Sequence, residues 1–555
     1  MIKENFIKLY ETGLHANWEF PALSDFGKDK TYYFSDVARE IAYIHVLFEQ
    51  CQVKKGDKIA LTGKDCAHWC MAFMATITYG AVIVPILQDF PPHDMLHIIN
   101  HSDSIILFSS DKIWKKLDSE KMPAIQKVFL LEEHFPCLYR NDSEDLQEID
   151  TRAALKMREK YPNGYTKDDI RYAEVDNSEL IEINYTSGTT GFSKGVMLSA
   201  NNLAGNVTWG MSINLMSRGD KELCFLPLAH VLSCAFNLLA PMVIGSHVHI
   251  LHRRPTPTVL LDAFRKVRPH LIITVPMILE KIYKNAILPQ LKKPVIKFAL
   301  KIPFLAKLVY AKINKTLCDK MGGRFIEVIQ GGAPISQEVA EFLYKIKFPI
   351  ASGYGMTECG PMIGSSRHQE FTPTSSVHLV KDIMEVRIDS NDPYHEVGEI
   401  QVRGENVMMG YYKNEEATQN AFTADGWFRT GDLGVIDDER RIFIKGRTKS
   451  MILSSNGQNI YPEELEAKLN NLPYILESIV IERNRRLVAL VYPDHEQLER
   501  EQIPAEEIPN IMEKNRIHVN KMLAIYEQIK KIELHPTEFV KTPKKSIKRY
   551  LYQNV

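Results

Sequence analysis

The densest cluster of side chains that could bind an anion lies between Tyr185 and Gly195, which reads YTSGTTGFSKG. These eleven residues include five aliphatic hydroxyls, three glycines and one lysine. Glycines let a backbone turn tightly and direct N–H groups at an anion, hydroxyls add donors, and a lysine adds positive charge. This composition predicts a loop that holds phosphate groups.

The spacing of this segment differs from that of the P-loop. Counting from Gly188, the position that requires glycine holds Ser193, and Lys194 is followed by Gly195 rather than by serine or threonine. The alternative interpretation is a flexible surface loop of small residues. A strand-like run over 180–185 precedes the segment and a helical pattern from Asn201 follows it, and this context favours the phosphate-binding interpretation.

Five further motifs follow in order: GGAPI at 331–335, GYGMTE at 353–358, GWFRTGD at 426–432, KGRTK at 445–449 and GQNIYPEE at 457–464. With the first segment, they resemble the motifs of the adenylate-forming superfamily, which comprises acyl-CoA synthetases, nonribosomal adenylation domains and luciferases. The resemblance is greatest to long-chain fatty acid–CoA ligases and extends from about residue 35 to the C-terminus. Ser193 departs from it, because the family usually has proline there.

The resemblance implies that the chain joins a carboxylate to the α-phosphate of ATP, expels pyrophosphate and then transfers the acyl group to CoA. Negative charge accumulates on phosphoryl oxygens in such a reaction. Glu358 and the hydroxyl of Thr189 would bind Mg²⁺, a hard cation that prefers oxygen, and Thr357 would donate to the α-phosphate. The implied ATP-binding residues are Thr186, Ser187, Gly188, Thr189, Thr190, Gly191, Lys194, Gly332, Ala333, Tyr354, Gly355, Met356, Asp432 and Arg447.

The nucleoside would be bound by two of these motifs and by the ribose segment. By resemblance, Tyr354 would stack on adenine, whose edge would meet the backbone of Gly332 and Ala333. Asp432 would accept both ribose hydroxyls, and Arg447 would help to fix the sugar. Outside its motif, Tyr354 would be interpreted as a core aromatic residue, just as an isolated Glu358 would be interpreted as a solvated acid.

Three other positions have implied roles in binding the acyl group and CoA. LPLAH at 226–230 resembles the segment whose histidine lies near the acyl carboxylate, so His230 would position the substrate; alone, it would be a satisfied core histidine. Lys449 occupies the hinge position, beside Ser450 where an acidic residue is common, and the small domain would rotate there between the two half-reactions. Gly457 would border the pantetheine channel.

The tail departs from the family pattern at one important position. The family ends with a lysine that bridges the substrate carboxylate and the α-phosphate, whereas residues 541–549 read KTPKKSIKR and place Ser546 in that register. A serine supplies no positive charge. We predict that the adjacent Lys545 takes this role, with Lys544 and Lys548 as weaker candidates; the alternative is a merely solvated basic face.

The whole-chain composition is that of an ordinary folded protein. The 555 residues are 45% hydrophobic and 25% charged, and 68 basic against 69 acidic residues give a net charge of −1. This balance argues against a nucleic-acid partner. The charged N-terminus lacks the apolar core of a signal peptide, and the most apolar window, 71–87, is too short to span a bilayer. Cys66, His68 and Cys70 are interpreted as core residues rather than metal ligands. We predict a cytoplasmic location.

Strand-like and helical patterns alternate twice along the chain, over the first hundred-odd residues and again over 223–330, which indicates parallel sheets with covering helices. After Gly360, short β-like runs broken by glycine indicate an antiparallel part. With the resemblance, this predicts an α/β protein. Its large domain, 1–446, would have two sheet lobes and a small β-barrel-like subdomain at about 361–446. A small mobile α+β domain would follow, 447–555.

Residues 291–315 contain seven lysines, no acid and many apolar side chains, with Pro294 and Pro303 limiting any continuous helix. Two interpretations stay open: contact with a membrane surface, or a helix pair packed on the large domain with solvated lysines. This insertion, a stand-alone length and the expected lack of a carrier module favour a long-chain fatty acid–CoA ligase, cytoplasmic or peripheral at the inner membrane face. The alternatives are a ligase for another carboxylate such as an aromatic acid, an acyl–carrier-protein synthetase, or a non-catalytic nucleotide-binding membrane-associated protein. Acyl chain length and oligomeric state do not follow from sequence.

Overall fold

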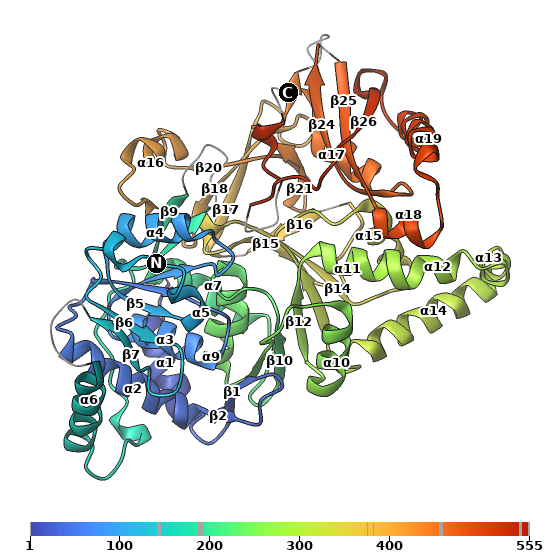
Figure 1. The fold of residues 1–555 in the computed structure, drawn as a ribbon. Coiled ribbons are helices and arrows are strands. Elements are labelled where there is room, and N and C mark those ends of the chain that lie inside the picture. Colours follow the sequence, from blue (N-terminus) through green and yellow to red (C-terminus); the bar gives the residue numbers. More distant parts are fainter. Residues whose placement is uncertain are drawn as a thin grey trace.

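Two large sheets and a separate small sheet organise the chain (Figure 1). The structure, a computed structural model, describes residues 2–140, 146–186, 193–374, 376–380, 382–453, 459–484, 486–542 and 547–552. The elements of the first two lobes come from the N-terminal four-fifths of the chain, and the small sheet comes from the remainder. This arrangement confirms the predicted α/β class with a large domain and a smaller C-terminal one.

The first lobe is built on a mostly parallel sheet whose central strands are buried on both faces. Val82–Ile86, for example, is buried at every position, and such continuous apolar runs are typical of parallel strands covered by helices. Within the described residues, the strands lie in the order β19 (Gly410–Tyr411), β9 (Lys194–Ser199), β8 (Leu180–Thr186), β4 (Val82–Ile86), β3 (Lys58–Thr62), β5 (Ser104–Ser109), β6 (Lys127–Leu130) and β7 (Cys137–Arg140). Its helices are α2 (Phe34–Gln50), α3 (Ala67–Thr78), α4 (Pro92–His101), α5 (Asp111–Trp114) and α6 (Leu146–Lys160).

The second lobe has a longer sheet that continues into the β-rich part of the chain. Its strands lie in the order β17 (Met384–Asp389), β18 (Gly398–Gly404), β20 (Phe428–Ile436), β21 (Arg441–Arg447), β16 (Ser376–Leu379), β15 (Met362–Ser366), β14 (Ile350–Gly355), β13 (Glu327–Gln330), β12 (Leu271–Thr274), β10 (Lys221–Cys224), β11 (His247–Ile250), β1 (Pro21–Asp25) and β2 (Thr31–Tyr33). Pairing is parallel from β1 through β11, β10, β12 and β13 to β14, and antiparallel from β14 to β17. The predicted antiparallel part is therefore hydrogen-bonded to the parallel sheet at β14.

The helices of the second lobe include two π-helical segments. In chain order the elements are α1 (Phe6–Ala16), α7 (Ala200–Ser212), α8 (Val231–Cys234), η3 (Ala235–Leu239), α9 (Ala240–Ile244), α10 (Pro257–Val267), α11 (Pro276–Ile282), η4 (Tyr283–Ile287), α12 (Leu288–Leu291), α13 (Pro294–Leu300), α14 (Pro303–Lys320), α15 (Gln337–Lys345) and α16 (Glu415–Ala421). The π segments are η3 and η4. Such segments are frequent at functional sites; η4 contains Lys284, and η3 directly follows α8, which His230 caps.

The small domain has its own apolar core. It comprises β22 (Ile452–Leu453), β23 (Asn459–Ile460), α17 (Pro462–Asn470), β24 (Ile475–Arg483), β25 (Arg486–Pro493), α18 (His495–Arg500), α19 (Ile508–Asn520), β26 (Ile529–Leu534) and η8 (Arg549–Leu551). Buried side chains of α17, α19 and the β24–β25–β26 sheet pack together, separately from the cores of the two lobes. Strand β21 crosses the predicted boundary at 446, which stays a prediction.

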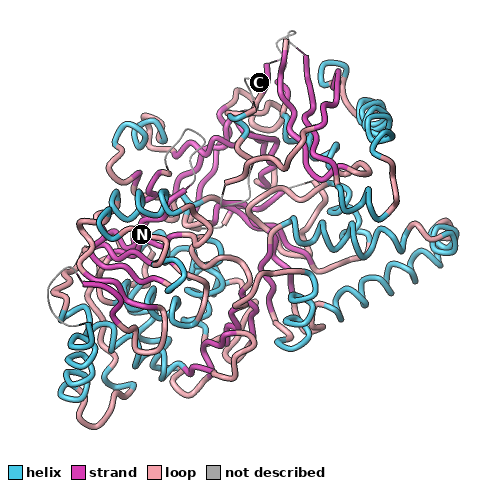
Figure 2. The backbone as a smooth tube through the Cα atoms, in the orientation of Figure 1, coloured by secondary structure: helices cyan, strands magenta, loops and turns pink. Residues whose placement is uncertain are grey.

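Helices α13 and α14 form an arm that extends away from the second lobe, at the right of Figure 1 and in cyan in Figure 2. Both helices begin at a proline, where the missing N–H leaves no helical hydrogen bond unmade. The interruptions expected at Pro294 and Pro303 are thus present. Among the helices in the described part of the chain, none combines the length and hydropathy needed to cross a bilayer.

Candidate adenylate-forming site

The phosphate loop connects the two strands of a hairpin. Strands β8 and β9 are antiparallel, and Thr186 pairs with Lys194 in their register. The hairpin therefore brings both ends of the predicted loop together. The predicted loop residues Ser187, Gly188, Thr189, Thr190 and Gly191 lie outside the described residues.

Tyr411 connects Lys194 to Glu358. The Lys194 ammonium lies 4.7 Å from the centre of the Tyr411 ring, and the Tyr411 hydroxyl donates to Glu358 Oε1 at 3.0 Å. Tyr411 is placed there by β19, where it pairs with Val196 of β9. Burial and the neighbouring Glu358 raise the pKa of the Tyr411 hydroxyl, so it remains a donor at neutral pH. Sequence reasoning missed Tyr411; the run Gly410-Tyr-Tyr412 was the available signal.

The GYGMTE motif forms the end of β14 and the short 3₁₀ helix η5 (Thr357–Cys359). A Cβ on Gly355 would lie 2.1 Å from the carbonyl oxygen of Pro361, so only glycine fits this close approach. The turn leaves Thr357 buried and Glu358 half-buried. The backbone of Glu358 is held by the N–H of Met408, which donates to its carbonyl at 2.9 Å.

The GGAPI motif follows β13, beside the motif at the end of β14. A Cβ built on Gly331 would lie 3.2 Å from the carbonyl oxygen of Gly353, so the two loops touch through backbone. Gly332 has φ +85° with open space around its Cα, and Ala333 is exposed. The left-handed φ favours glycine at 332 and presents the following backbone to solvent. A flat ring could approach these two loops, which the sequence assigns to adenine.

Asp432 accepts two hydrogen bonds from residues that the sequence also assigned to ATP. The Tyr354 hydroxyl donates to its Oδ2 at 2.8 Å, and Arg447 Nε donates to its Oδ1 at 2.8 Å. The pairing of β20 with β21 places Asp432 opposite Arg447. The adjacent carboxylate raises the pKa of Arg447. A carboxylate has about four acceptor sites, so the buried Asp432 retains capacity for ribose hydroxyls.

His230 lies between the phosphate strand and the GGAPI loop. It is half-buried and caps α8, and the side chain of Leu232 on that helix would lie 3.8 Å from a Cβ on Gly331. From the other side, Asn184 of β8 donates to the carbonyl of Ala229 at 3.1 Å. Asn184 also donates to Glu182 at 2.9 Å, and burial raises the pKa of that carboxyl to about 7. The structure thus brings the segment around His230 close to β8, which leads into the phosphate loop, and to the GGAPI loop.

The hinge segment is attached to the ribose segment. The N–H of Thr448 donates to the carbonyl of Gly431 at 2.9 Å, and Lys449 is exposed immediately after it. Ser450, where the family usually has an acid, hydrogen-bonds instead to Glu463 at the start of α17. Gly457 lies outside the described residues.

The two ends of the tail segment, near residues 541 and 547, are hydrogen-bonded to each other. Lys541 and Ile547 form an antiparallel bridge, and the N–H of Lys548 donates to the carbonyl of Val540 at 2.8 Å. Lys541 is ion-paired with Glu477 at 2.7 Å, and Arg549 is ion-paired with Glu466 of α17. Lys541 and Arg549 are therefore both paired with carboxylates of the small domain itself. Lys544, Lys545 and Ser546 lie outside the described residues.

The small domain contacts the second lobe through Lys284. Its ammonium, in the π segment η4, donates to the backbone carbonyl of Asn470 at the end of α17 at 2.7 Å. Burial lowers the pKa of Lys284, and Glu280 opposes that shift. Because Asn470 contributes only a backbone oxygen, this contact can break and re-form without leaving a second charge unpaired.

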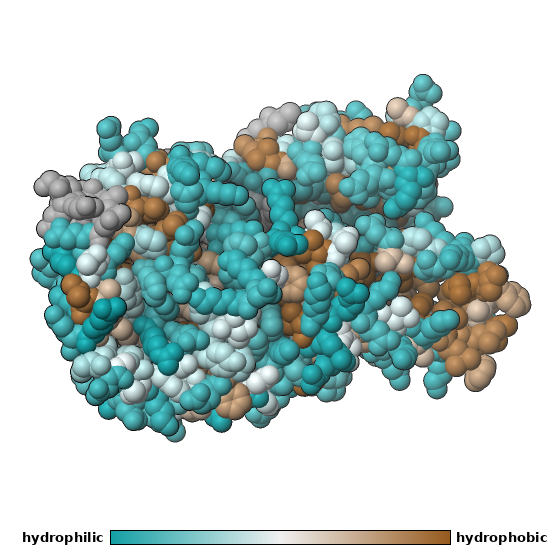
Figure 3. All heavy atoms as spheres, turned by 60° about the horizontal axis from the view of Figure 1, so that its bottom comes forward, coloured by the Kyte–Doolittle hydropathy of each residue, from teal (hydrophilic) through white to brown (hydrophobic). Residues whose placement is uncertain are grey.

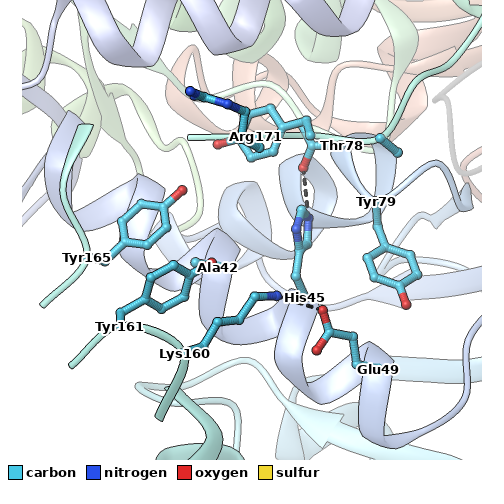
Figure 4. A pocket seen from close by; sticks show the side chains of 11 residues that line it. Ala42, His45, Glu49, Thr78, Tyr79, Lys160, Tyr161, Tyr165 and Arg171 are labelled. Atoms are coloured by element: carbon cyan, nitrogen blue, oxygen red, sulfur yellow. Dashed lines mark hydrogen bonds and ion pairs between the residues drawn. The ribbon is translucent and has the colours of Figure 1, made fainter. Parts of the chain in front are cut away.

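A cavity of about 200 Å³ lies in the first lobe, and none of the predicted site residues that the structure describes lines it. Figure 4 shows His45 directed at Thr78 and Lys160 directed at Glu49. The lining residues are Ala42, His45, Glu49, Thr78, Tyr79, Lys160, Tyr161, Tyr165, Arg171, Tyr172 and Ala173. Lys160 and Glu49 are 2.8 Å apart and neutralise each other, so we assign no ligand to this cavity.

Comparison with known proteins agrees with this geometry. A family model described as AMP-binding enzyme matches residues 13–412, and one described as AMP-binding enzyme C-terminal domain matches residues 449–554. The chain belongs to the AMP-binding enzyme family. The similar curated proteins include CoA ligases for acids of several classes.

Three comparisons illustrate this range. A long-chain-fatty-acid–CoA ligase of Mycobacterium bovis is 27% identical over 469 residues, 77% of this chain and 71% of its own. A 4-coumarate–CoA ligase of Solanum tuberosum is 25% identical over 484 residues, which are 83% of this chain and 78% of its own. The crystal structure of Bacillus subtilis o-succinylbenzoate CoA synthetase with ATP and a magnesium ion has a TM-score of 0.73 at 20% identity, covering 98% of each chain. The similarity to this last structure shows that the two chains share a fold.

Proposed function

We propose that this protein is an ATP-dependent, AMP-forming acyl-CoA synthetase whose carboxylate substrate is a long-chain fatty acid. The observation that carries the proposal is the Lys194–Tyr411–Glu358 arrangement beside the β8–β9 hairpin. It holds a cation and a carboxylate near the loop that the sequence assigns to phosphate, and such preorganised charges stabilise the charge that develops in phosphoryl transfer.

The described ATP-site residues have compatible positions. Tyr354, Asp432 and Arg447 form one hydrogen-bonded group that would bind the nucleoside, with the exposed backbone at Gly332 and Ala333 beside it. Thr186 and Lys194 pair at the ends of the phosphate loop. Ser187, Gly188, Thr190 and Gly191 would cradle the departing pyrophosphate, Gly355 and Met356 would shape the nucleoside side, and Thr357 would donate to the α-phosphate.

Magnesium fits the donor set at Glu358. Its Oε1 accepts from Tyr411, and Oε2 accepts no hydrogen bond and forms no ion pair within the described residues. Mg²⁺ is usually held by one or two carboxylates together with substrate phosphates, rather than by a protein cage. Glu358 and Thr189 would hold the ion, which would neutralise negative charge on the phosphates. In the described part of the chain, no group of three or more His, Cys, Asp or Glu side chains is arranged for a metal ion.

CoA would react in a second half-reaction after the small domain has rotated. Lys449 would be the hinge, Gly457 would border the pantetheine channel, and Lys545 would serve the first half-reaction only. The proposed units are 1–446, with its β-rich part at about 361–446, and 447–555. The hydrogen bond from Lys284 to a backbone carbonyl can break without leaving a second charge unpaired, which is compatible with such a rotation.

His230 would position the acyl carboxylate, because it lies between the hairpin and the nucleoside loops. The long-chain assignment is supported by the M. bovis relative and by the basic, apolar segment at 291–315. The 4-coumarate ligase, at similar identity, keeps an aromatic acid as the second candidate. An acylated carrier protein is the other candidate product. The proposed location is cytoplasmic, with peripheral contact at the inner face of a membrane.

The test is AMP release by the purified chain with ATP, Mg²⁺, CoA and a panel of carboxylates. Long-chain, medium-chain and aromatic acids are compared, and a carrier protein replaces CoA in a parallel series. Long-chain acids with CoA should give the highest kcat/KM. Preference for an aromatic acid or for the carrier protein would replace the substrate assignment, and no AMP with any acid would reject the catalytic proposal. Glu358→Gln is the matched control for contaminating activity.

A further inference from the structure

The arm formed by α13 and α14 has a packed base and a projecting tip. Leu317 belongs to the core of the second lobe, and Tyr310 and Ile313 pack against that core. Helices α13 and α14 contact each other, α13 also contacts α12, and α14 also reaches α10. Figure 1 shows α13 at the far end of the arm, with α12 leading out to it and α14 returning to the body of the molecule; Lys301 and Ile302 connect α13 to α14. The tip, formed by α13 and the start of α14, is thus supported by contacts among α12, α13 and α14.

Large apolar side chains are exposed on this tip. Val295 is 77% exposed, Phe298 66%, Phe304 71% and Leu308 53%. They come from both helices, and Figure 3 shows hydrophobic surface on the projecting arm at its right. Soluble proteins rarely expose contiguous apolar surface without a binding partner, because burying it releases free energy in proportion to its area. The exposed apolar surface of the arm tip therefore indicates a binding site.

Lysines are interspersed with these apolar residues, and most of them form no ion pair within the described residues. In 291–315 the positions are 292, 293, 297, 301, 307, 312 and 315, and no acid lies in this range. Lys315 pairs with Asp319 at 3.6 Å. Lys297, Lys301 and Lys307 form no ion pair with any described carboxylate. The net charge of the chain is −1, so this positive charge is a local feature and not a property of the whole surface.

The combination of exposed apolar side chains and lysines indicates which kind of partner binds the arm tip. Protein–protein interfaces are depleted in lysine, whereas membrane-surface helices combine Phe and Leu on one side with flanking lysines that reach anionic headgroups. We propose that the arm tip docks on an anionic lipid bilayer, with Phe298 and Phe304 inserted at the headgroup–acyl boundary and Lys297, Lys301 and Lys307 bound to lipid phosphates. This proposal extends the expected membrane contact to named inserting and headgroup-binding side chains.

Flotation of the full-length chain tests the proposal without ATP or an acyl substrate. Its failure would remove the proposed membrane contact and leave the proposed acyl-CoA synthetase activity standing. The vesicles are pure phosphatidylcholine or phosphatidylcholine with phosphatidylglycerol, each at low and high salt. The wild-type chain should float with the anionic vesicles at low salt and be released by high salt. F298S/F304S should lower partition by about tenfold or more, and each of K297Q, K301Q and K307Q by about fivefold at low salt.

Matched controls are I525S and K530Q, which alter an exposed apolar residue and an exposed lysine on the small domain. They should float like the wild type, and all variants should keep its thermal midpoint because none removes a core contact. Absence of low-salt binding to anionic vesicles overturns the proposal, as does binding that the tip variants do not change. Sedimentation is measured in parallel: if the tip instead supports self-association that F298S/F304S abolishes, without vesicle binding, the occupant is a second copy and the lipid proposal is wrong.

Discussion

The hydroxyl of Tyr411 donates to the carboxylate of Glu358 at 3.0 Å, while the Lys194 ammonium lies 4.7 Å from the centre of the same aromatic ring. Residues from three distant parts of the chain are joined in this way. A phenol can orient an anion through its hydroxyl and attract a cation through its face, so one side chain positions both charges.

Tyr411→Phe should lower ATP–pyrophosphate exchange by about tenfold, because a hydrogen bond to a charged group contributes about 1.5–3 kcal/mol. The ring beneath Lys194 remains in this variant. Tyr411→Leu removes both interactions and should be more damaging. The expected signature is a higher Mg²⁺ requirement in both variants. Unchanged exchange and Mg²⁺ dependence in Tyr411→Phe would show that Glu358 needs no such orientation.

Glu358→Gln and Lys194→Ala should each lower the exchange rate by about 10²–10³-fold, the usual effect of removing a charged contact from a developing negative charge. Glu358→Gln keeps the size of the side chain and its ability to accept from Tyr411. A normal exchange rate in Glu358→Gln would refute its assignment as the magnesium ligand.

Asp432→Asn should raise the KM for ATP by at least about tenfold, because the carboxylate that accepts from the ribose would lose its charge. The same change should reduce the discrimination between ATP and 2′-deoxy-ATP. Tyr354→Phe, which removes one of the donors to Asp432, is expected to have a smaller effect of the same kind. If Asp432→Asn discriminates between the two nucleotides as the wild type does, Asp432 does not contact the ribose.

Lys545→Ala should cripple acyl-adenylate formation and leave the attack of CoA on supplied acyl-AMP largely intact. Lys544→Ala and Lys548→Ala are the matched controls on the same short segment, whose ends are joined at Lys541 and Ile547. Normal adenylation in Lys545→Ala with loss in either control would show that the register is wrong. A steep rise in Ser546→Lys would show that the wild-type site is a weakened one.

His45 should make the stability of the first lobe depend on pH. Burial lowers its pKa from 6.5 to about 4, so the unfolded chain takes up the proton first as pH falls. The part of the unfolding free energy that depends on a neutral His45 is therefore fully present above about pH 6.5 and is lost progressively toward pH 4. Between about pH 7 and about pH 5 the loss is about 2 kcal/mol.

His45→Gln keeps a donor for the carbonyl of Ala75 but does not titrate. Unfolding free energies measured across this range should fall less steeply for the variant than for the wild type. Parallel pH profiles of the two proteins would contradict the assignment. The buried His68 and His247, whose pKa values burial lowers to about 4, should retain part of the pH dependence in the variant.

The motifs themselves could be identified in the sequence because each is contiguous. Phosphate loops and tight turns depend on local backbone freedom, as at Gly355 and Gly332, and local requirements are encoded by neighbouring residue types. The alternation of strands and helices was readable for the same reason: burial on one or both faces imposes a short period on apolar residues. The α/β class and the antiparallel part after Gly360 followed from these patterns.

Tertiary structure alone decided which distant residues meet. Tyr411 lies more than two hundred positions from Lys194, and only the pairing of β19 with β9 brings its ring beneath that ammonium. The link from Tyr354 to Asp432 likewise depends on strands from separate motifs. The sequence left residues 291–315 between two interpretations, whereas the structure shows a projecting arm with exposed apolar side chains. Periodicity reports which face of an element is apolar, but the packing of the whole chain determines whether that face is covered.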